Sequence, residues 1–194
     1  MALVKQVATK IICQIKKGNY SRFQLHYVCG PMGSGKSSYT DNVLLKKYDI
    51  KAYHCNIDKY ICYFDDADSY TLYTLCRKVG IIVTDYLLDN RISMIIEGIG
   101  VNKDTVEFLK KARQSDYTVN TYFMMIDMET CRERVKNRNN KGRHKVTDEN
   151  VIKAYNILYG DDSEMKEMIE PESDNVYAMN SANNDFVKPI DSLL

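Results

Sequence analysis

The chain has 194 residues, of which 44% are apolar, and this is enough for the core of one domain of ordinary size. Its 27 basic and 26 acidic residues nearly cancel, which argues against a strongly basic surface for nucleic acid. No apolar run reaches spanning length, and the 6 cysteines, without a C-x-x-C pair, favour a reducing setting. We therefore expect a single cytoplasmic domain over residues 1–194, with no membrane and no nucleic-acid partner.

The first segment has the pattern of an amphipathic helix. Its apolar residues recur at helical spacing: Leu3, Val7, Ile11, Ile12 and Ile15. Two interpretations remain open, a helix packed on the domain within residues 1–20 or a targeting helix at a membrane surface. We favour the packed helix, because the apolar positions form no unbroken signal-peptide core.

A predicted strand at 25–29 leads into G-P-M-G-S-G-K-S, a full match to the phosphate-binding loop G-x-x-x-x-G-K-[ST]. The predicted nucleotide-binding residues are Gly30, Pro31, Met32, Gly33, Ser34, Gly35, Lys36, Ser37 and Ser38. Glycines let successive N–H groups turn inward around a phosphate, Lys36 is placed for the β- and γ-phosphates, and Ser37 for Mg²⁺ at a helix start. The alternative is an ordinary glycine-rich turn between a strand and a helix.

Strands and helices alternate along the rest of the chain. The expected helices cover 38–47, 68–90, 103–115, 128–137 and 147–159, and the expected strands cover 51–56, 92–96, 117–126 and 175–179. This order predicts a three-layer α/β fold of the P-loop kinase type, with a mostly parallel sheet of about five strands. Ligands then bind beyond the carboxyl ends of the strands, where Asp58, Glu97 and Asp127 follow.

Asp58 lies 22 positions after Lys36, just beyond the second predicted strand. Phosphoryl transfer requires an oriented acceptor hydroxyl and neutralised charge, and it needs little covalent chemistry from the protein. We predict that Asp58 is the catalytic base and contacts the substrate. The alternative is a turn or capping residue beside Asn56.

Glu97 ends the apolar run M-I-I-E-G. There a carboxylate can hold a Mg²⁺-bound water or accept a hydrogen bond from a substrate hydroxyl. We predict a substrate-binding role. The alternative is a strand that ends in a flexible glycine turn.

Positive charge is concentrated late in the chain. The basic residues between 132 and 145 are Arg132, Arg134, Lys136, Arg138, Lys141, Arg143 and Lys145. A helix with one buried stripe leaves Arg134 and Arg138 one turn apart, with Arg143 on the loop beyond. Guanidinium groups suit phosphate oxygens, so we predict an arginine-bearing lid over the nucleotide, with Arg138 toward the substrate. A solvated basic face is the alternative.

Other residues are weaker candidates. His26 and His54 lie in predicted strands and are expected to be packed, and His144 is a poor metal ligand because it has no ligand companions. The tyrosines that follow Asp58 are either core or a wall that stacks the acceptor: Tyr60, Tyr63, Tyr70 and Tyr73.

Taken together, the phosphate loop, N-I-D at 56–58, I-I-E-G-I-G at 95–100, the arginine helix and G-R-H-K-V at 142–146 resemble the zeta toxin family of P-loop kinases over residues 24–160. The resemblance implies nucleotide and metal binding at Lys36 and Ser37, and Asp58 as general base. It also implies a sugar contact at Glu97, with Arg134 and Arg143 as phosphate clamps. Many members phosphorylate the sugar of UDP-N-acetylglucosamine. This chain departs from the family on the acceptor side, where Lys59 to Cys62 replace an expected arginine and Ile99 replaces a threonine.

The sequence thus predicts a phosphotransferase that uses ATP (or GTP) with Mg²⁺ and acts on a hydroxyl of a small nucleotide-linked or phosphorylated acceptor. A UDP-sugar kinase is favoured, with an antitoxin-like protein as an implied partner. A nucleoside or nucleotide kinase and a nucleotide-binding switch without transfer are the alternatives.

Overall fold

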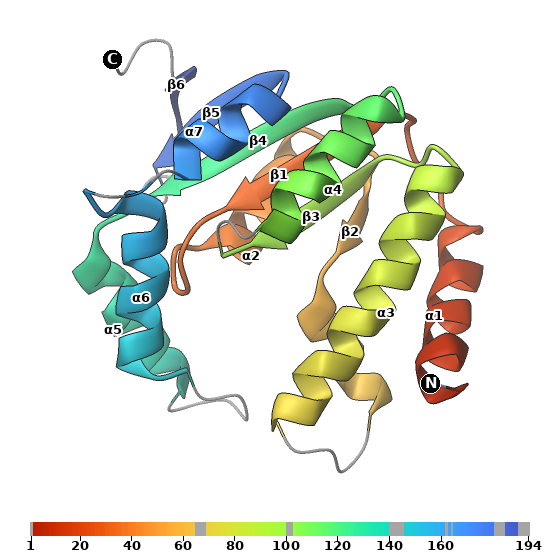
Figure 1. Ribbon diagram of the computed structural model, residues 1–194, viewed down its shortest axis with the longest axis horizontal. Helices are drawn as coiled ribbons and strands as arrows, with labels where there is room; N and C mark the ends of the chain where they lie inside the picture. Colours follow the sequence, from red (N-terminus) through yellow and green to blue (C-terminus); the bar gives the residue numbers. More distant parts are fainter. Residues whose placement is uncertain are drawn as a thin grey trace.

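The structure is a computed structural model that describes residues 2–64, 69–99, 103–139, 146–161, 163, 165–180 and 185–189. A sheet lies at its centre (Figure 1). Its strands are β1 (Gln24–Cys29), β2 (Tyr53–Cys55), β3 (Met94–Gly98), β4 (Thr118–Met125), β5 (Asn175–Asn180) and β6 (Asp185–Pro189). The order is β2-β3-β1-β4-β5-β6, and β6 alone of these runs antiparallel to its neighbour. The predicted α/β fold with a mostly parallel sheet is confirmed, and β6 is a sixth strand that the sequence did not predict.

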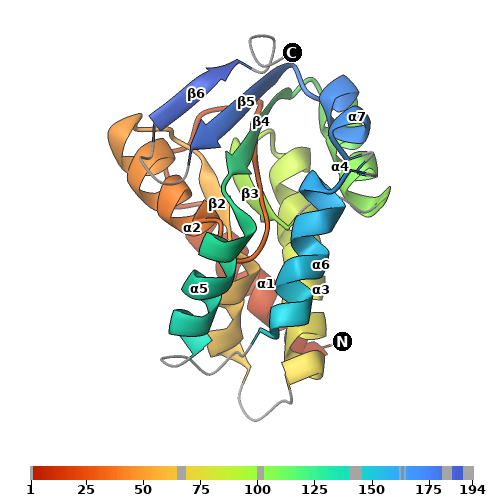
Figure 2. The same cartoon turned by 90° about the vertical axis from the view of Figure 1, so that its left-hand side faces the viewer.

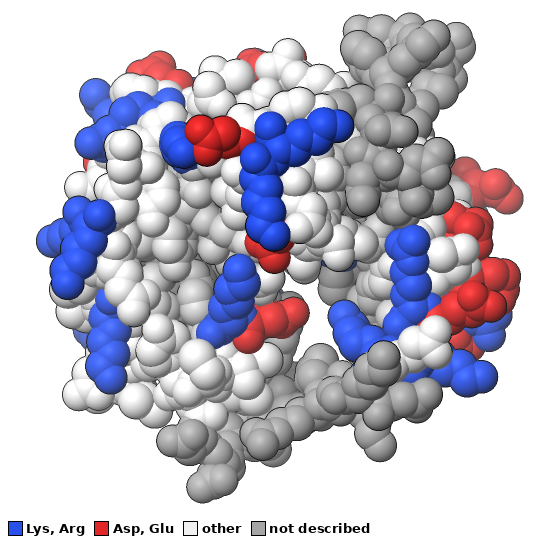
Figure 3. All heavy atoms as spheres, turned by 180° about the vertical axis from the view of Figure 1, so that it is seen from behind, with Lys and Arg blue, Asp and Glu red and all other residues white. Residues whose placement is uncertain are grey.

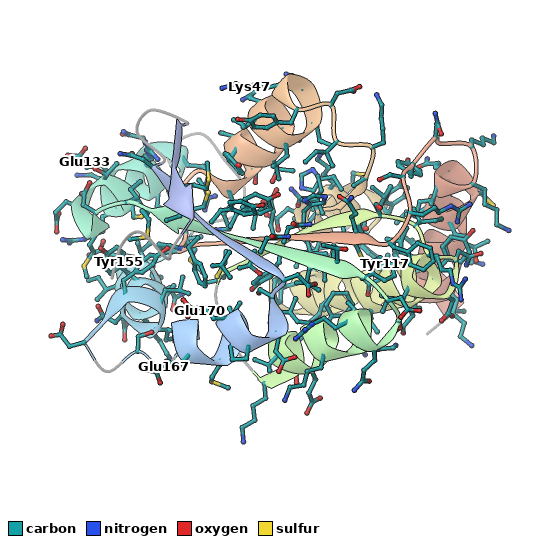
Figure 4. The ribbon with its side chains drawn as sticks, turned by 90° about the horizontal axis from the view of Figure 1, so that it is seen from above. Lys47, Tyr117, Glu133, Tyr155, Glu167 and Glu170 are labelled. Atoms are coloured by element: carbon teal, nitrogen blue, oxygen red, sulfur yellow. The ribbon has the colours of Figure 1, made fainter. Side chains whose placement is uncertain are left out.

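Helices lie on both faces of this sheet. They are α1 (Ala2–Ile15), α2 (Lys36–Tyr39), α3 (Ser69–Asp89), α4 (Lys103–Gln114), α5 (Met128–Asn139), α6 (Asp148–Tyr159) and α7 (Met165–Ile169). Three further segments are the π-helix η1 (Thr40–Lys47) and the 3-10 helices η2 (Ile57–Tyr63) and η3 (Glu170–Glu172). Seen from above, η1, which ends at Lys47, covers one face, and α3, α4 and α7 lie on the other (Figure 4).

Alternation along β1 explains the two faces. Leu25, Tyr27 and Cys29 belong to the core cluster that includes α1 and α3. Val28, between them, belongs to the second cluster, which α2 and η1 cover with Tyr39, Val43 and Leu44. Successive side chains of a strand point to opposite faces, so a central strand buried on both sides is apolar throughout. This is why β1 is a nearly continuous apolar run.

Helix α1 packs against α3 along the edge of the molecule. Its buried residues are Val4, Val7, Ala8, Ile11 and Ile15, whereas Leu3 is half exposed. The predicted apolar face was therefore wrong at Leu3, because Val4 and Ala8 complete the buried stripe at a spacing of three and four residues. No helix in the described part of the chain combines the length and hydropathy that a bilayer span requires.

Several boundaries differ from the prediction near the phosphate loop. The helix expected at 38–47 begins earlier, at Lys36, and widens into the π-helix from Thr40. The strand expected at 92–96 is β3, two residues later, so Glu97 lies inside the strand. Strand β2 is shorter than the expected 51–56 and is followed at once by η2. Short strands that pair on few residues carry weak local signals, and tertiary pairing sets their ends.

Candidate active site

The phosphate loop joins β1 to α2 and is fixed at both ends. The Gly30 N–H donates to the Gly98 carbonyl at the end of β3, at 3.1 Å. Gly33 and Gly35 have φ values of 83° and 90°, which side-chain-bearing residues rarely adopt. A Cβ at Gly33 would clash with the Cys131 carbonyl of α5, so this glycine also allows α5 to lie directly on the loop. The loop therefore has the backbone of an anion cradle.

Lys36 begins α2 and folds back over the loop. Its Nζ donates to the carbonyls of Gly30 and Pro31 at 2.8 and 2.9 Å. Desolvation by burial lowers its pKa, while the neighbouring Cys29, Glu97 and Cys131 oppose that change. A half-buried ammonium with carbonyl partners suits an anionic ligand, which would replace weak dipoles by full negative charge.

Ser37, the predicted metal ligand, contacts Glu97 directly. Its Oγ donates to Glu97 Oε2 at 2.6 Å, and the second carboxylate oxygen, Oε1, lies 2.6 Å from Nε2 of His54. The Glu97 side chain is 11% exposed and that of His54 is 6% exposed. Burial raises the pKa of Glu97, but the hydrogen bonds from His54 and Ser37 outweigh it and leave the pKa below its usual value. Glu97 is thus an ionised carboxylate beside the hydroxyl that the sequence predicts as a metal ligand.

The contacts of His54 extend this group to η1. Nδ1 of His54 lies 3.4 Å from Oδ1 of Asp41, and Lys59 Nζ of η2 lies 3.9 Å from the same oxygen. The sequence indicated a packed role for His54. It is packed, and it is also bonded to a predicted site residue. The adjacency of β2 and β3, on which this contact depends, leaves no mark in the local pattern.

Asp58 lies in the first turn of η2 and is exposed. Asn56 is the N-cap of this helix, and its side chain accepts a hydrogen bond from the Asp58 N–H at 3.0 Å. The backbone N–H of Asp58 therefore takes part in the capping turn beside Asn56, as the structural alternative predicted. The Asp58 carboxylate remains accessible to solvent. The catalytic role stays a prediction.

The arginines of α5 divide between two directions. Arg134 Nη1 lies 3.4 Å from the Gly33 carbonyl, and Arg138 is close enough to Lys36 for its charge to lower the pKa of that lysine, after the larger effect of burial. Arg132 instead grips Asp148 of α6 through Nε and Nη2, at 2.7 and 2.6 Å. Arg134 is thus brought to the loop, while Arg138 acts on Lys36 through its charge. Arg132 braces the α5–α6 pair, and Arg143 lies outside the described residues.

Other candidates have structural roles. Asp127 is exposed beyond β4 and bonds Thr130 twice, at 2.7 Å each, as a cap of α5. The backbone hydrogen bond from Thr130 is the main cause that lowers its pKa. Tyr60 is buried in the core, Tyr63 packs beside it and Tyr73 is exposed. His144 and the side chain of Tyr70 lie outside what the structure describes.

The site faces a hollow at the carboxyl ends of the strands. Helices α5 and α6 run side by side below the sheet (Figure 2), and α3, with η2 packed against it, extends on the opposite side (Figure 1). The space-filling view from behind shows an opening between the two parts, with basic side chains on the α5 side (Figure 3). A groove of about 1050 Å³ beside α6 and α7, lined by Ile152, Asn156 and Met168 among others, lies away from these groups.

A family model for the zeta toxin matches residues 15–188, which is most of the chain. The chain therefore belongs to the zeta toxin family, as the resemblance indicated. Membership of this family and the P-loop kinase fold support a nucleotide-binding, kinase-like phosphotransferase. No curated protein sequence matches the chain.

Solved structures agree on the fold. A chain of the PezAT chromosomal toxin-antitoxin system of Streptococcus pneumoniae superposes with a TM-score of 0.78 at 11% identity, over 98% of this chain and 81% of that one. A chain of AvrRxo1-ORF1:-ORF2 with ATP gives 0.65 at 13% identity, over 96% and 66%. A putative kinase from Chloroflexus aurantiacus gives 0.53 at 12% identity, over 69% and 75%. At these identities the similarity shows the fold.

Proposed function

We propose that the protein is a kinase that transfers the γ-phosphoryl group of ATP, or GTP, to a hydroxyl of a small nucleotide-linked or phosphorylated molecule. The observation that carries this is the meeting of Lys36, the Ser37–Glu97 pair and Arg134 of α5 at one glycine-rich loop. A loop that merely connected a strand to a helix would not need this convergence of anion-binding and metal-orienting groups.

The described residues fit a nucleoside triphosphate with Mg²⁺. The loop presents backbone N–H groups under two positive-φ glycines, and Lys36 supplies charge for the β- and γ-phosphates. Mg²⁺ binds through one or two protein oxygens, water and substrate phosphates, and it supplies charge neutralisation during transfer. Because the Ser37 hydroxyl donates its hydrogen bond to Glu97, its lone pairs remain available for that ion.

Asp58 is the proposed base on the acceptor side. Its carboxylate is exposed beyond the carboxyl end of β2, and β2 pairs with β3, which carries Glu97. An acceptor hydroxyl positioned there would give its proton to Asp58 as its oxygen attacks the γ-phosphorus, while the bond to the β-phosphate oxygen breaks and ADP leaves. Arg134 and Arg138, with Arg143 as predicted, would neutralise charge on the migrating group.

A UDP-sugar is the favoured acceptor because of the family relationship. Two other outcomes are kept as alternatives, a nucleoside or nucleotide kinase and a nucleotide-binding switch with little or no transfer. The chain's replacements after Asp58 and at Ile99 fall on the acceptor side, so this is where its substrate is expected to differ from that of its relatives.

An acceptor screen tests the proposal. The purified protein is incubated with γ-labelled ATP or GTP, MgCl₂ and separate panels of UDP-sugars, nucleosides, nucleotides and oligonucleotides. Label on a UDP-sugar supports the favoured function, and label on a nucleoside or nucleotide selects the alternative kinase. Tight nucleotide binding without transfer to any acceptor selects the switch, and absence of binding contradicts all three.

The family also supports an antitoxin-like protein partner. A solved structure of similar fold comes from the PezAT toxin-antitoxin system. If the products of genes adjacent to this one are co-expressed with it, a stable complex with lower transfer activity is expected.

A further inference from the structure

Glu97 is held by two donors at once, and only one of them belongs to the phosphate loop. Ser37 Oγ reaches Oε2, and His54 Nε2 reaches Oε1, each at 2.6 Å. An ionised carboxylate can only accept, so His54 must carry a proton on Nε2 to make this contact. The imidazole side chain is almost wholly buried, at 6% exposed. Its orientation is therefore set by packing as well as by the hydrogen bond.

The chain of contacts that begins at Ser37 ends at Asp41, in the same helical segment. Ser37 is in α2, Glu97 in β3, His54 in β2 and Asp41 in η1, four residues after Ser37 in a continuous helical segment. The register pairs His54 with Ile95, so His54 and Glu97 lie on the same face of neighbouring strands. Four side chains thus join the helix that follows the phosphate loop to two strand ends.

We propose that His54 is a positioning residue for the metal-binding hydroxyl. By holding Oε1, it fixes the orientation of the Glu97 carboxylate so that Oε2 accepts the hydrogen bond from the Ser37 hydroxyl. The Ser37 lone pairs then face away from Glu97. Without His54, Glu97 would swing to water or to Lys36, and Ser37 would lose its fixed orientation. Such outer hydrogen-bond partners change metal affinity by about 10- to 100-fold when removed.

This inference rests on the proposed function, because it concerns the Mg²⁺ that accompanies the nucleotide. The chain offers matched variants. His54→Gln keeps a nitrogen donor at the same reach, His54→Leu removes it, and Asp41→Asn changes only the outer end of the group. His26→Leu is the control. His26 is also a buried strand histidine, but its hydrogen-bond partner is the Tyr122 hydroxyl, at 3.0 Å, and not Glu97.

The measurement is the Kd of ADP by titration calorimetry, in EDTA and in excess MgCl₂. The ratio of the Kd in EDTA to the Kd in MgCl₂ reports the coupling between metal and nucleotide. We expect His54→Leu to reduce this ratio by about tenfold or more, with the EDTA value changed less than about twofold. His54→Gln should restore most of the ratio, Asp41→Asn should reduce it slightly, and His26→Leu should leave it unchanged even where it lowers the Tm.

An unchanged ratio in His54→Leu overturns the inference, as does a folded His54→Gln variant that behaves like His54→Leu. If the wild-type protein shows no effect of MgCl₂ on ADP binding, the metal part of the proposed function fails and takes the inference with it. A nitrogen-15 spectrum of the wild-type imidazoles adds a readout that needs no nucleotide. A proton on Nε2 of His54 is expected, and a proton on Nδ1 alone contradicts the contact with Glu97.

Discussion

The two sides of the hollow differ in how far they are assembled. On the nucleotide side, Lys36, Ser37 and Glu97 are each held by hydrogen bonds of 2.6 to 2.9 Å. On the acceptor side, Asp58 is exposed and bonds Asn56 through its backbone N–H. The difference teaches that the chain pre-organises the phosphate loop and the carboxylate beside it, whereas the predicted acceptor side is left open to solvent.

Lys36→Ala should have the largest effect, because it breaks the pre-organised side. It removes the ammonium that we propose neutralises the β- and γ-phosphates, so we expect transfer to fall by about 1000-fold or more and nucleotide binding to weaken. Calorimetry with Mg-ATP and a transfer assay with the acceptor found in the screen measure both. Lys46→Ala is the control, since Lys46 is exposed and bonds Asn42. Equal behaviour of the two variants would remove the basis of the comparison.

Asp58→Asn should break the acceptor side alone. The amide has nearly the same shape but cannot accept the proton of the hydroxyl, so the transfer rate should drop by about 100- to 10,000-fold. The Kd of Mg-ATP should stay within about twofold, because Asp58 is not part of the loop. Retained transfer would show that Asp58 is only a turn residue. Asp49→Asn, at an exposed ion pair with Lys51, controls for loss of surface charge.

Variants of two arginines of α5 distinguish a phosphate contact from a structural ion pair. Arg134→Ala removes a charge beside the Gly33 carbonyl, and we expect transfer to fall by about 100-fold with little change in stability. Arg132→Ala breaks the bidentate pair with Asp148 and should lower the Tm slightly, with a smaller effect on transfer. Kinetics and thermal unfolding of both variants separate a phosphate contact from a brace. The opposite pattern would exchange their roles.

The smallest expected effect is the contribution of His26 to the pH dependence of stability. His26 is a buried strand histidine like His54, but it lies outside the candidate site. Burial lowers the pKa of His26 to about 4, from 6.5. Between these values the unfolded chain binds a proton that the native state does not, so stability falls as the pH drops from 6.5 toward 4. His26→Phe should remove about 2 kcal/mol of the loss between pH 7.5 and 4.5, as measured by urea unfolding. An identical pH dependence of variant and wild type would show that the pKa of His26 is the same in the native and unfolded states.

Much of the fold follows from the sequence, since apolar periodicity and the order of strands and helices are local signals. The phosphate loop is the clearest case, because its glycines are required by backbone angles at Gly33 and Gly35. The missed elements depend on distant partners. Strand β6 is defined by pairing with β5, and η1 is a π-helix, which no residue pattern announces.

The same contrast applies to the site. Lys36 and Ser37 are identified by a motif of adjacent residues. The contact between His54 and Glu97 joins residues 43 positions apart, and it exists because β2 and β3 are neighbours in the sheet. Arg132 and Arg134 look equivalent in the sequence, and only the place of α6 gives Arg132 to Asp148. Chemistry that depends on such neighbours is seen only once the chain is folded.

The missing side chain at Gly33 has a wider consequence. Since the Cys131 carbonyl occupies the space where a Cβ would stand, the backbone of the arginine-bearing helix α5 packs directly against the loop. A substitution at Gly33 would therefore push away the very helix that carries Arg134. Any redesign of this protein toward another nucleotide must therefore change the loop and α5 together, because a shift in one displaces the other.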